Sequence, residues 1–360
     1  MGIEMVIEIK KKKKSRKKAL IICAVVLAAI ILLFTAATIV VSVNMDKNFG
    51  RGDYEPQELS FYYFYPKYES RYPRENVTFK SGENTLQGYI YGAENDKALL
   101  VFAHGIGSAH EEYLKTLLWF VDNGYRVFTY DATGSGHSEG AGTKGLPQSA
   151  LDLHAALGYI ENDSELNAMP KFLVGHSWGG YAVTAALNFG HKIDGVASVS
   201  GYAEPVEMIY EFATGVVGNA RPLLYPSIWI YNKLLFGEYA GLSAVKGINS
   251  ADTPVLIIHG TADETISYTE SAIMNKRGLI TNPNVKYLTL DGCNHSGMFD
   301  TAEAAAIKEE ISQQKREAKT ESELIEIYKN ADLDTVNQPN AEFLSQIDEF
   351  FKEILDKKAA

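Results

Sequence analysis

The chain of 360 residues has only two cysteines, Cys23 and Cys293, and they lie in different regions. Cys23 falls inside an apolar run, so the sequence offers no disulfide framework. No cysteines and histidines cluster at metal-ligand spacing, so we expect no metal site. Apolar residues make up 46% of the chain, which is enough for one substantial core.

The chain carries a net charge of −11, yet its first 18 residues are strongly basic. Residues 1–18 hold eight lysines and arginines against Glu4 and Glu8, and residues 19–43 have no charged side chain. Residues 44–360 therefore carry −17. An acidic domain lacks the basic surface that nucleic-acid binding requires, so we expect no nucleic-acid partner.

Residues 19–43 form one uninterrupted uncharged and mostly apolar run. As a helix this run would extend about 37 Å, which is enough to cross a bilayer once. The basic residues directly before it predict a cytoplasmic N-terminus and an extracytoplasmic domain at the cell membrane. The alternative is a cleaved signal peptide, whose apolar region is usually about 7–15 residues long. We predict a cytoplasmic segment at 1–18, a transmembrane signal-anchor at 19–43 and a stalk at 44–75.

From residue 76 onward, strand-like apolar runs alternate with helical stretches. This alternation predicts an α/β fold with a mostly parallel twisted sheet of about eight strands and helices on both faces. Residues 77–79 and 86–91 predict an opening antiparallel pair. The remaining strands are expected at 99–103, 126–130, 172–175, 196–199, 255–258 and 286–290, with helices near 111–122, 149–161, 178–189 and 267–277.

Two stretches break the alternation within the domain predicted at 76–360. Residues 202–250 are rich in aromatics and too long for a simple connection, so they predict a helical lid. Residues 301–340 are charged and predict a helical insertion, either a solvated hairpin or a wall of the pocket mouth. The lid aromatics either pack short helices or contact substrate, and the candidates for substrate binding are Tyr202, Tyr210 and Trp229.

The pentapeptide Gly175-His176-Ser177-Trp178-Gly179 follows a short apolar run and precedes a small-residue helical stretch. G-x-S-x-G in this setting is a nucleophile elbow, which holds a serine on a tight turn between a buried strand and a helix. A side chain at either glycine would clash where strand and helix approach each other. The alternative role for Ser177 is a simple helix N-cap.

Further motifs surround the elbow in a fixed order. Residues 104–107 (HGIG) end one apolar strand, and residues 131–138 (DATGSGHS) form a D-x-x-G-x-G-x-S loop after the next. Asp263 and His295 each follow a later strand. With these motifs, residues 76–300 resemble the α/β-hydrolase fold superfamily, in particular its serine esterase, monoglyceride-lipase and serine-aminopeptidase-like branch.

The resemblance implies a Ser-His-Asp catalytic triad in the hydrolase order of serine, aspartate and histidine. Ser177 is the expected nucleophile, His295 its general base, and Asp263 the group that orients the imidazole. Glu264 is the alternative to Asp263. The oxyanion hole would consist of two backbone N–H groups, those of Ile106 and Trp178.

We therefore expect a membrane-anchored extracytoplasmic serine hydrolase that cleaves small-molecule acyl esters through an acyl-enzyme, without a cofactor. Gly134 and Gly136 could begin a dinucleotide-binding fingerprint, but Glu139 stands where that fingerprint requires a third glycine. The sequence therefore gives no sign of a dinucleotide cofactor. An aminopeptidase-like or amidase activity is the first alternative and needs a carboxylate near the pocket, for which Glu204 and Glu207 are candidates. A non-catalytic surface binding module is the second alternative, and the oligomeric state stays open.

Overall fold

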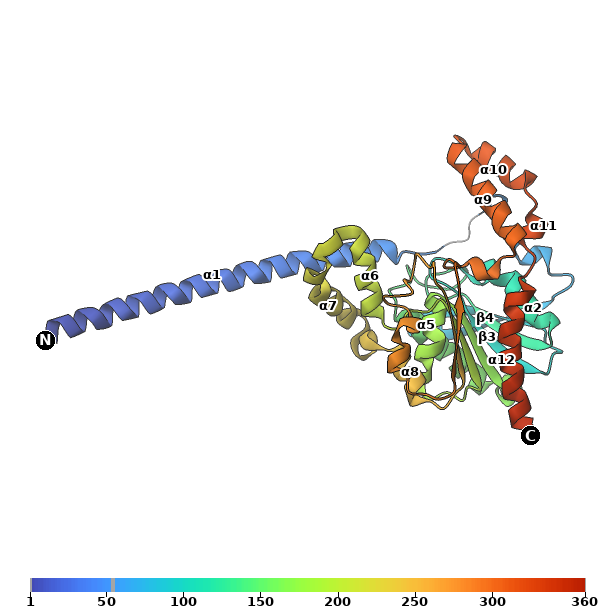
Figure 1. Ribbon diagram of the computed structural model, residues 1–360, viewed down its shortest axis with the longest axis horizontal. Helices are drawn as coiled ribbons and strands as arrows, with labels where there is room; N and C mark the ends of the chain where they lie inside the picture. Colours follow the sequence, from blue (N-terminus) through green and yellow to red (C-terminus); the bar gives the residue numbers. More distant parts are fainter. Residues whose placement is uncertain (1, 53–55, 360) are drawn as a thin grey trace.

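The structure is a computed structural model that describes residues 2–52 and 56–359 (Figure 1). Its centre is one eight-stranded sheet in the order β1-β2-β4-β3-β5-β6-β7-β8. The first two pairings, β1 with β2 and β2 with β4, are antiparallel, and all the others are parallel. The predicted sheet is therefore confirmed, with strands at Arg74–Ser81, Asn84–Tyr91, Ala98–Ala103, Tyr125–Tyr130, Lys171–His176, Gly195–Val199, Val255–Gly260 and Val285–Leu290 (β1 to β8).

Helices cover both faces of the sheet. The side chains of β3 are buried at every position, because Leu99 and Val101 face one apolar cluster and Leu100 and Phe102 face the other. A strand covered on both sides reads as a continuous apolar run. One face carries α2 (Leu114–Asp122) and α12 (Ala341–Ala359), and the other carries α3 (Gln148–Asn162), α5 (Trp178–Ala185) and α8 (Ala244–Ser250).

The helix expected near 267–277 is different in the structure. Residues 267–272 form turns, and a 3-10 helix, η7 (Ile273–Leu279), follows them. The carboxylate of Glu211 accepts the backbone N–H groups of Ser267 at 2.7 Å and Ser271 at 2.9 Å. In an α-helix beginning at Ser267, the Ser271 N–H would bond to the Ser267 carbonyl, so its hydrogen bond to Glu211 competes with helix formation there.

The first helix, α1 (Gly2–Asn48), continues beyond the predicted end of the apolar run. Thr38 Oγ1 donates to Ser227 Oγ at 3.1 Å, and the Tyr231 hydroxyl donates to Asp46 Oδ1 at 3.0 Å. The last part of α1 is thus attached to the 202–250 segment (Figure 1). Partly or fully buried side chains recur there at three- and four-residue spacing along one face, at Phe34, Thr38, Val41 and Met45, and Phe49 follows directly after the helix.

The predicted stalk is not a free spacer where the structure describes it, and its residues 53–55 lie outside the described part. Gly52 N–H donates to the carbonyl of Gly134 at 2.9 Å, so the chain leaving α1 runs along the 131–138 loop. Further on, the ring of Phe61 packs edge-on against Tyr328 with centroids 5.4 Å apart. This aromatic side chain of the segment therefore packs on the domain.

The two irregular stretches are both helical. The 202–250 segment contains α6 (Pro205–Val217) and α7 (Tyr225–Phe236), which lie beside the end of α1 (Figure 1). The 301–340 segment forms α9 (Ala302–Glu317), α10 (Glu321–Asn330) and α11 (Leu333–Val336), as its composition predicts. A capping box between Thr320 and Glu323 begins α10.

Candidate active site

Ser177 occupies a strained turn between β5 and α5, with φ 57° and ψ −115°. A positive φ is rare for a residue with a side chain, and such strain clusters at functional sites. An added Cβ at Gly175 would overlap the carbonyl of Gly179, and one at Gly179 would overlap the carbonyl of Ala103. The clash predicted at the two glycines is therefore confirmed.

Asp263 and His295 form a hydrogen-bonded pair, with His295 Nδ1 lying 2.8 Å from Asp263 Oδ2. The other carboxylate oxygen accepts the N–H groups of Thr265 at 2.9 Å and Ile266 at 2.8 Å. Burial alone would raise the pKa of Asp263, but hydrogen bonds from His259 and His295 hold it well below its ordinary value. Since a carboxylate only accepts hydrogen bonds, the proton lies on Nδ1 and leaves Nε2 of His295 to act as a base.

Ser177 and His295 line one cavity of about 250 Å³, here called the catalytic pocket. The loop after β3 supplies another wall through Gly105, Ile106 and Gly107. The structure thus brings Ser177, the Asp263–His295 pair and Ile106 to one place. Polar side chains complete the lining, among them Tyr62, Glu112, Lys115 and Asp300.

Different elements position the two residues predicted to supply the oxyanion hole, Trp178 at the start of α5 and Ile106 in the loop after β3. Trp178 is the first residue of α5, where backbone N–H groups have no acceptor within the helix. Its indole N–H donates to the carbonyl of Leu146 at 2.8 Å, which holds the first turn in place. On the facing loop, His104 Nδ1 lies 2.7 Å from the carbonyl of Gly105, and its Nε2 accepts from Ala132 N–H at 2.9 Å.

The sequence analysis missed a chain of hydrogen bonds that joins the loop after β3, which contains Gly105, to the loop that contains His295. The N–H of Gly105 donates to the Tyr113 hydroxyl at 3.2 Å, and this hydroxyl lies 2.8 Å from His176 Nδ1. His176 Nε2 lies 3.0 Å from the carbonyl of His295, to which it donates. Burial, with the neighbouring His295, lowers the pKa of His176 to about 3, so the ring is neutral. Its Nδ1 can then accept from the Tyr113 hydroxyl while its Nε2 donates to the His295 carbonyl. No motif marks Tyr113, because only the fold brings it to this site.

A model of the serine aminopeptidase (S33) family matches residues 94–240. The chain has the α/β-hydrolase fold. It is 29% identical to the uncharacterised protein YfhR of Salmonella typhimurium over 230 residues, which cover 61% of this chain and 73% of YfhR. The Pyrococcus furiosus esterase Pf2001 has a similar fold, with a TM-score of 0.52 and 18% identity over 70% of this chain and 94% of that one.

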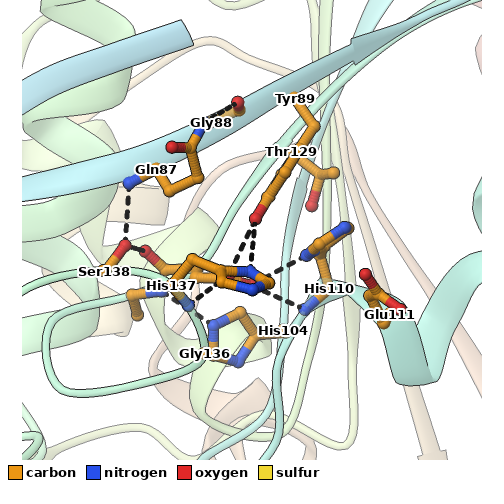
Figure 2. A network of polar contacts seen from close by, with 12 residues as sticks. Gln87, Gly88, Tyr89, His104, His110, Glu111, Thr129, Gly136, His137 and Ser138 are labelled. Carbon is orange, nitrogen blue, oxygen red and sulfur yellow. Dashed lines mark hydrogen bonds and ion pairs between the residues drawn. The ribbon is translucent and has the colours of Figure 1, made fainter. Parts of the chain in front are cut away.

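The loop at 131–138 has a structural part in this fold (Figure 2). Asp131 is fully buried and lies 2.8 Å from His110 Nδ1, and it accepts the His137 N–H at 2.9 Å and the Tyr89 hydroxyl at 3.1 Å. Although burial opposes its charge, these neighbours hold the pKa of Asp131 well below its ordinary value. The network fixes the loop whose Ala132 N–H supports His104.

The three aromatics that were candidates for substrate binding lie elsewhere in the structure. Tyr202 is buried and stacks on Tyr181 with centroids 4.5 Å apart. Tyr210 packs edge-on against Tyr225, and the Trp229 side chain is 51% exposed. Within the described residues, none of the three lines the catalytic pocket.

The two carboxylates considered for binding an amine also lie outside the described lining of the catalytic pocket. Glu207 forms an ion pair with Lys276 at 2.8 Å. The pocket instead has Glu112 in its wall, directly before Tyr113. The sequence offers no motif that would have singled out Glu112.

Proposed function

We propose that the protein is a membrane-anchored serine hydrolase that cleaves carboxylic esters through an acyl-enzyme. One observation carries this proposal: Ser177 is held in a strained elbow conformation and lines the same pocket as His295, whose Nδ1 is hydrogen-bonded to a buried, charged Asp263. A serine, a base and a group that orients the base are the parts that acyl transfer requires.

In the proposed reaction, His295 Nε2 takes the proton of Ser177 Oγ as this oxygen attacks the ester carbonyl carbon. The negative oxygen of the tetrahedral intermediate accepts the N–H groups of Ile106 and Trp178. His295 then gives its proton to the departing alcohol, which leaves the acyl group on Ser177. Water, activated by the same histidine, releases the acid.

The proposed anchor is α1, whose part from Lys13 to Asn48 contains an apolar stretch long enough to cross a bilayer. The side chains of residues 20–33 are exposed in the structure, so lipid is the solvent that suits them. The lysines before this stretch favour a cytoplasmic N-terminus and an extracytoplasmic hydrolase domain.

The activity is tested on the full chain in detergent with a small fluorophosphonate probe. We expect the wild type to be labelled, the Ser177→Ala variant to be unlabelled, and His295→Ala to react at least 100-fold more slowly. Folded wild-type protein that does not react would contradict the proposal and favour a non-catalytic binding module.

An aminopeptidase-like activity is a second candidate, because Glu112 places a carboxylate in the pocket wall. A carboxylate there suits the free ammonium group of an aminoacyl substrate. We expect the wild type to prefer an acetyl p-nitrophenyl ester over an aminoacyl p-nitroanilide. A preference for the amide that is lost in Glu112→Gln would instead establish the second candidate.

A further inference from the structure

The end of α1 and the 202–250 segment enclose an apolar cavity of about 370 Å³, here called the α1 cavity. Its walls come from two sides, with Val41, Met45 and Phe49 facing Ile209, Ala213 and Ile228. The volume lies within the range of about 300–1,000 Å³ that is typical of small-molecule sites. A cavity with this lining suits a hydrocarbon chain and gives a polar ligand few partners.

The α1 cavity adjoins the catalytic pocket at Ile106, whose side chain lines both. The N–H of the same residue is a proposed oxyanion donor. The carbonyl carbon of an ester attacked by Ser177 would therefore lie next to Ile106. An acyl chain attached to that carbon could extend from there into the α1 cavity, the apolar space that adjoins Ile106.

The α1 cavity also reaches the apolar outer surface of the molecule. Val40 and Phe212 line the cavity and are 57% and 51% exposed. Val40 belongs to the uncharged run of α1, and the neighbouring 202–250 segment exposes Leu223 and Leu234 at 79% each. Exposed apolar surface beside an apolar helix of spanning length is typical of contact with lipid.

We propose that the α1 cavity binds the acyl chain of a bilayer lipid ester, so that α1 is a wall of the substrate site as well as an anchor. The chain enters from the membrane between Val40 and Phe212 and runs past Ile106, which places its carbonyl carbon at Ser177. This inference rests on the proposed function and specifies its substrate class, a long-chain acyl ester dissolved in the membrane.

The test compares kcat/KM for an octanoyl and an acetyl ester of the same phenol, with the full chain in detergent. Each methylene that enters the cavity raises kcat/KM by up to about fourfold, so we expect a wild-type ratio of at least ten. Asn44→Trp fills the cavity from α1 and Ala213→Phe fills it from α6, and each should lower the ratio at least tenfold. The matched control is Val43→Trp, which lies outside the cavity lining at 62% exposure and should keep the wild-type ratio.

The outcomes separate the two proposals. If both filling variants react with fluorophosphonate and keep the wild-type ratio, the α1 cavity is not the acyl site, and the proposed function stands. If the wild type neither reacts with the probe nor cleaves the acetyl ester, the proposed function itself fails.

A second measurement tests the membrane as the source of the chain. A palmitoyl ester with a photoreactive diazirine at its chain end is dissolved in phosphatidylcholine vesicles that contain the full protein. We expect crosslinks within residues 38–49 and 205–228, and we expect Asn44→Trp to reduce them. Crosslinks confined to residues 19–33 would overturn the proposal, because they would show lipid around α1 alone.

Discussion

At the scale of single residues, the charge of Asp263 matters more than its shape. Asparagine at this position keeps the volume but removes the charge and allows the wrong imidazole tautomer. We expect Asp263→Asn to lower kcat for an acetyl ester about 10⁴-fold. The matched control is Glu264→Gln, an exposed neighbour, which should stay near wild type. Loss of activity in Glu264→Gln with little loss in Asp263→Asn would reassign the orienting role to Glu264.

His176 makes the stability of the fold depend on pH. Burial lowers its pKa from 6.5 to about 3, so between these values the unfolded chain binds a proton that the folded chain does not. The stabilisation is present above pH 6.5 and falls by about 1.4 kcal/mol for each pH unit below it. We expect the thermal-unfolding midpoint in detergent to fall from pH 7 to pH 5, and to fall less steeply in His176→Asn. Equal slopes would contradict this role.

At the scale of secondary-structure elements, a buried ion cluster joins α2 to α9. Asp300 accepts from Lys115 Nζ at 2.6 Å and from Lys308 Nζ at 2.8 Å, and the Lys115 side chain is only 3% exposed. Burial lowers the pKa of Lys115, and Asp300 opposes this effect. The charges of the two lysines are therefore compensated mainly by one carboxylate.

We expect Asp300→Asn to lower the free energy of unfolding by about 3 kcal/mol, because it leaves buried ammonium groups without their counter-charge. Chemical denaturation of the detergent-solubilised chain measures this change. The control is Glu309→Gln on α9, whose ion pair with Arg316 is exposed on both sides and should contribute under about 1 kcal/mol. Equal losses in the two variants would mean that burial does not determine the effect.

The elements that the sequence predicted well are those with a strong local pattern. The strands around residues 99–103 and 172–175 are apolar at every position, so their burial follows from composition alone. The stretch at 267–277 has helix-compatible residues, yet Glu211 of α6 accepts N–H groups of Ser267 and Ser271, and turns precede a 3-10 helix there. Competition by a distant side chain leaves no local signal.

At the scale of the whole molecule, α1 is both the proposed membrane anchor and a part of the packed domain. We expect the full chain to stay in the membrane pellet in alkaline carbonate and to leave it only in detergent. A variant that lacks residues 1–33 keeps the contacts from Phe34 onward but has too few apolar residues to span, so carbonate should release it. Release of the full chain by carbonate would contradict the anchor.

The sequence by itself determined the sheet, the order of serine, aspartate and histidine, and the apolar length of α1. These features are local, since the pattern of neighbouring residues is enough to predict a strand, an elbow or a spanning helix. Only the tertiary structure decided that Tyr113 and His176 connect two loops of the pocket, and that Tyr202 stacks in the core.

The structure also decided that the end of α1 closes a cavity against the 202–250 segment. The two walls of that cavity are more than 150 positions apart in the chain, as Val41 on one wall and Ile209 on the other show. Apolar side chains attract one another without direction, so a sequence specifies that such residues are buried but not which of them meet. Their partners are determined by the packing of the complete fold.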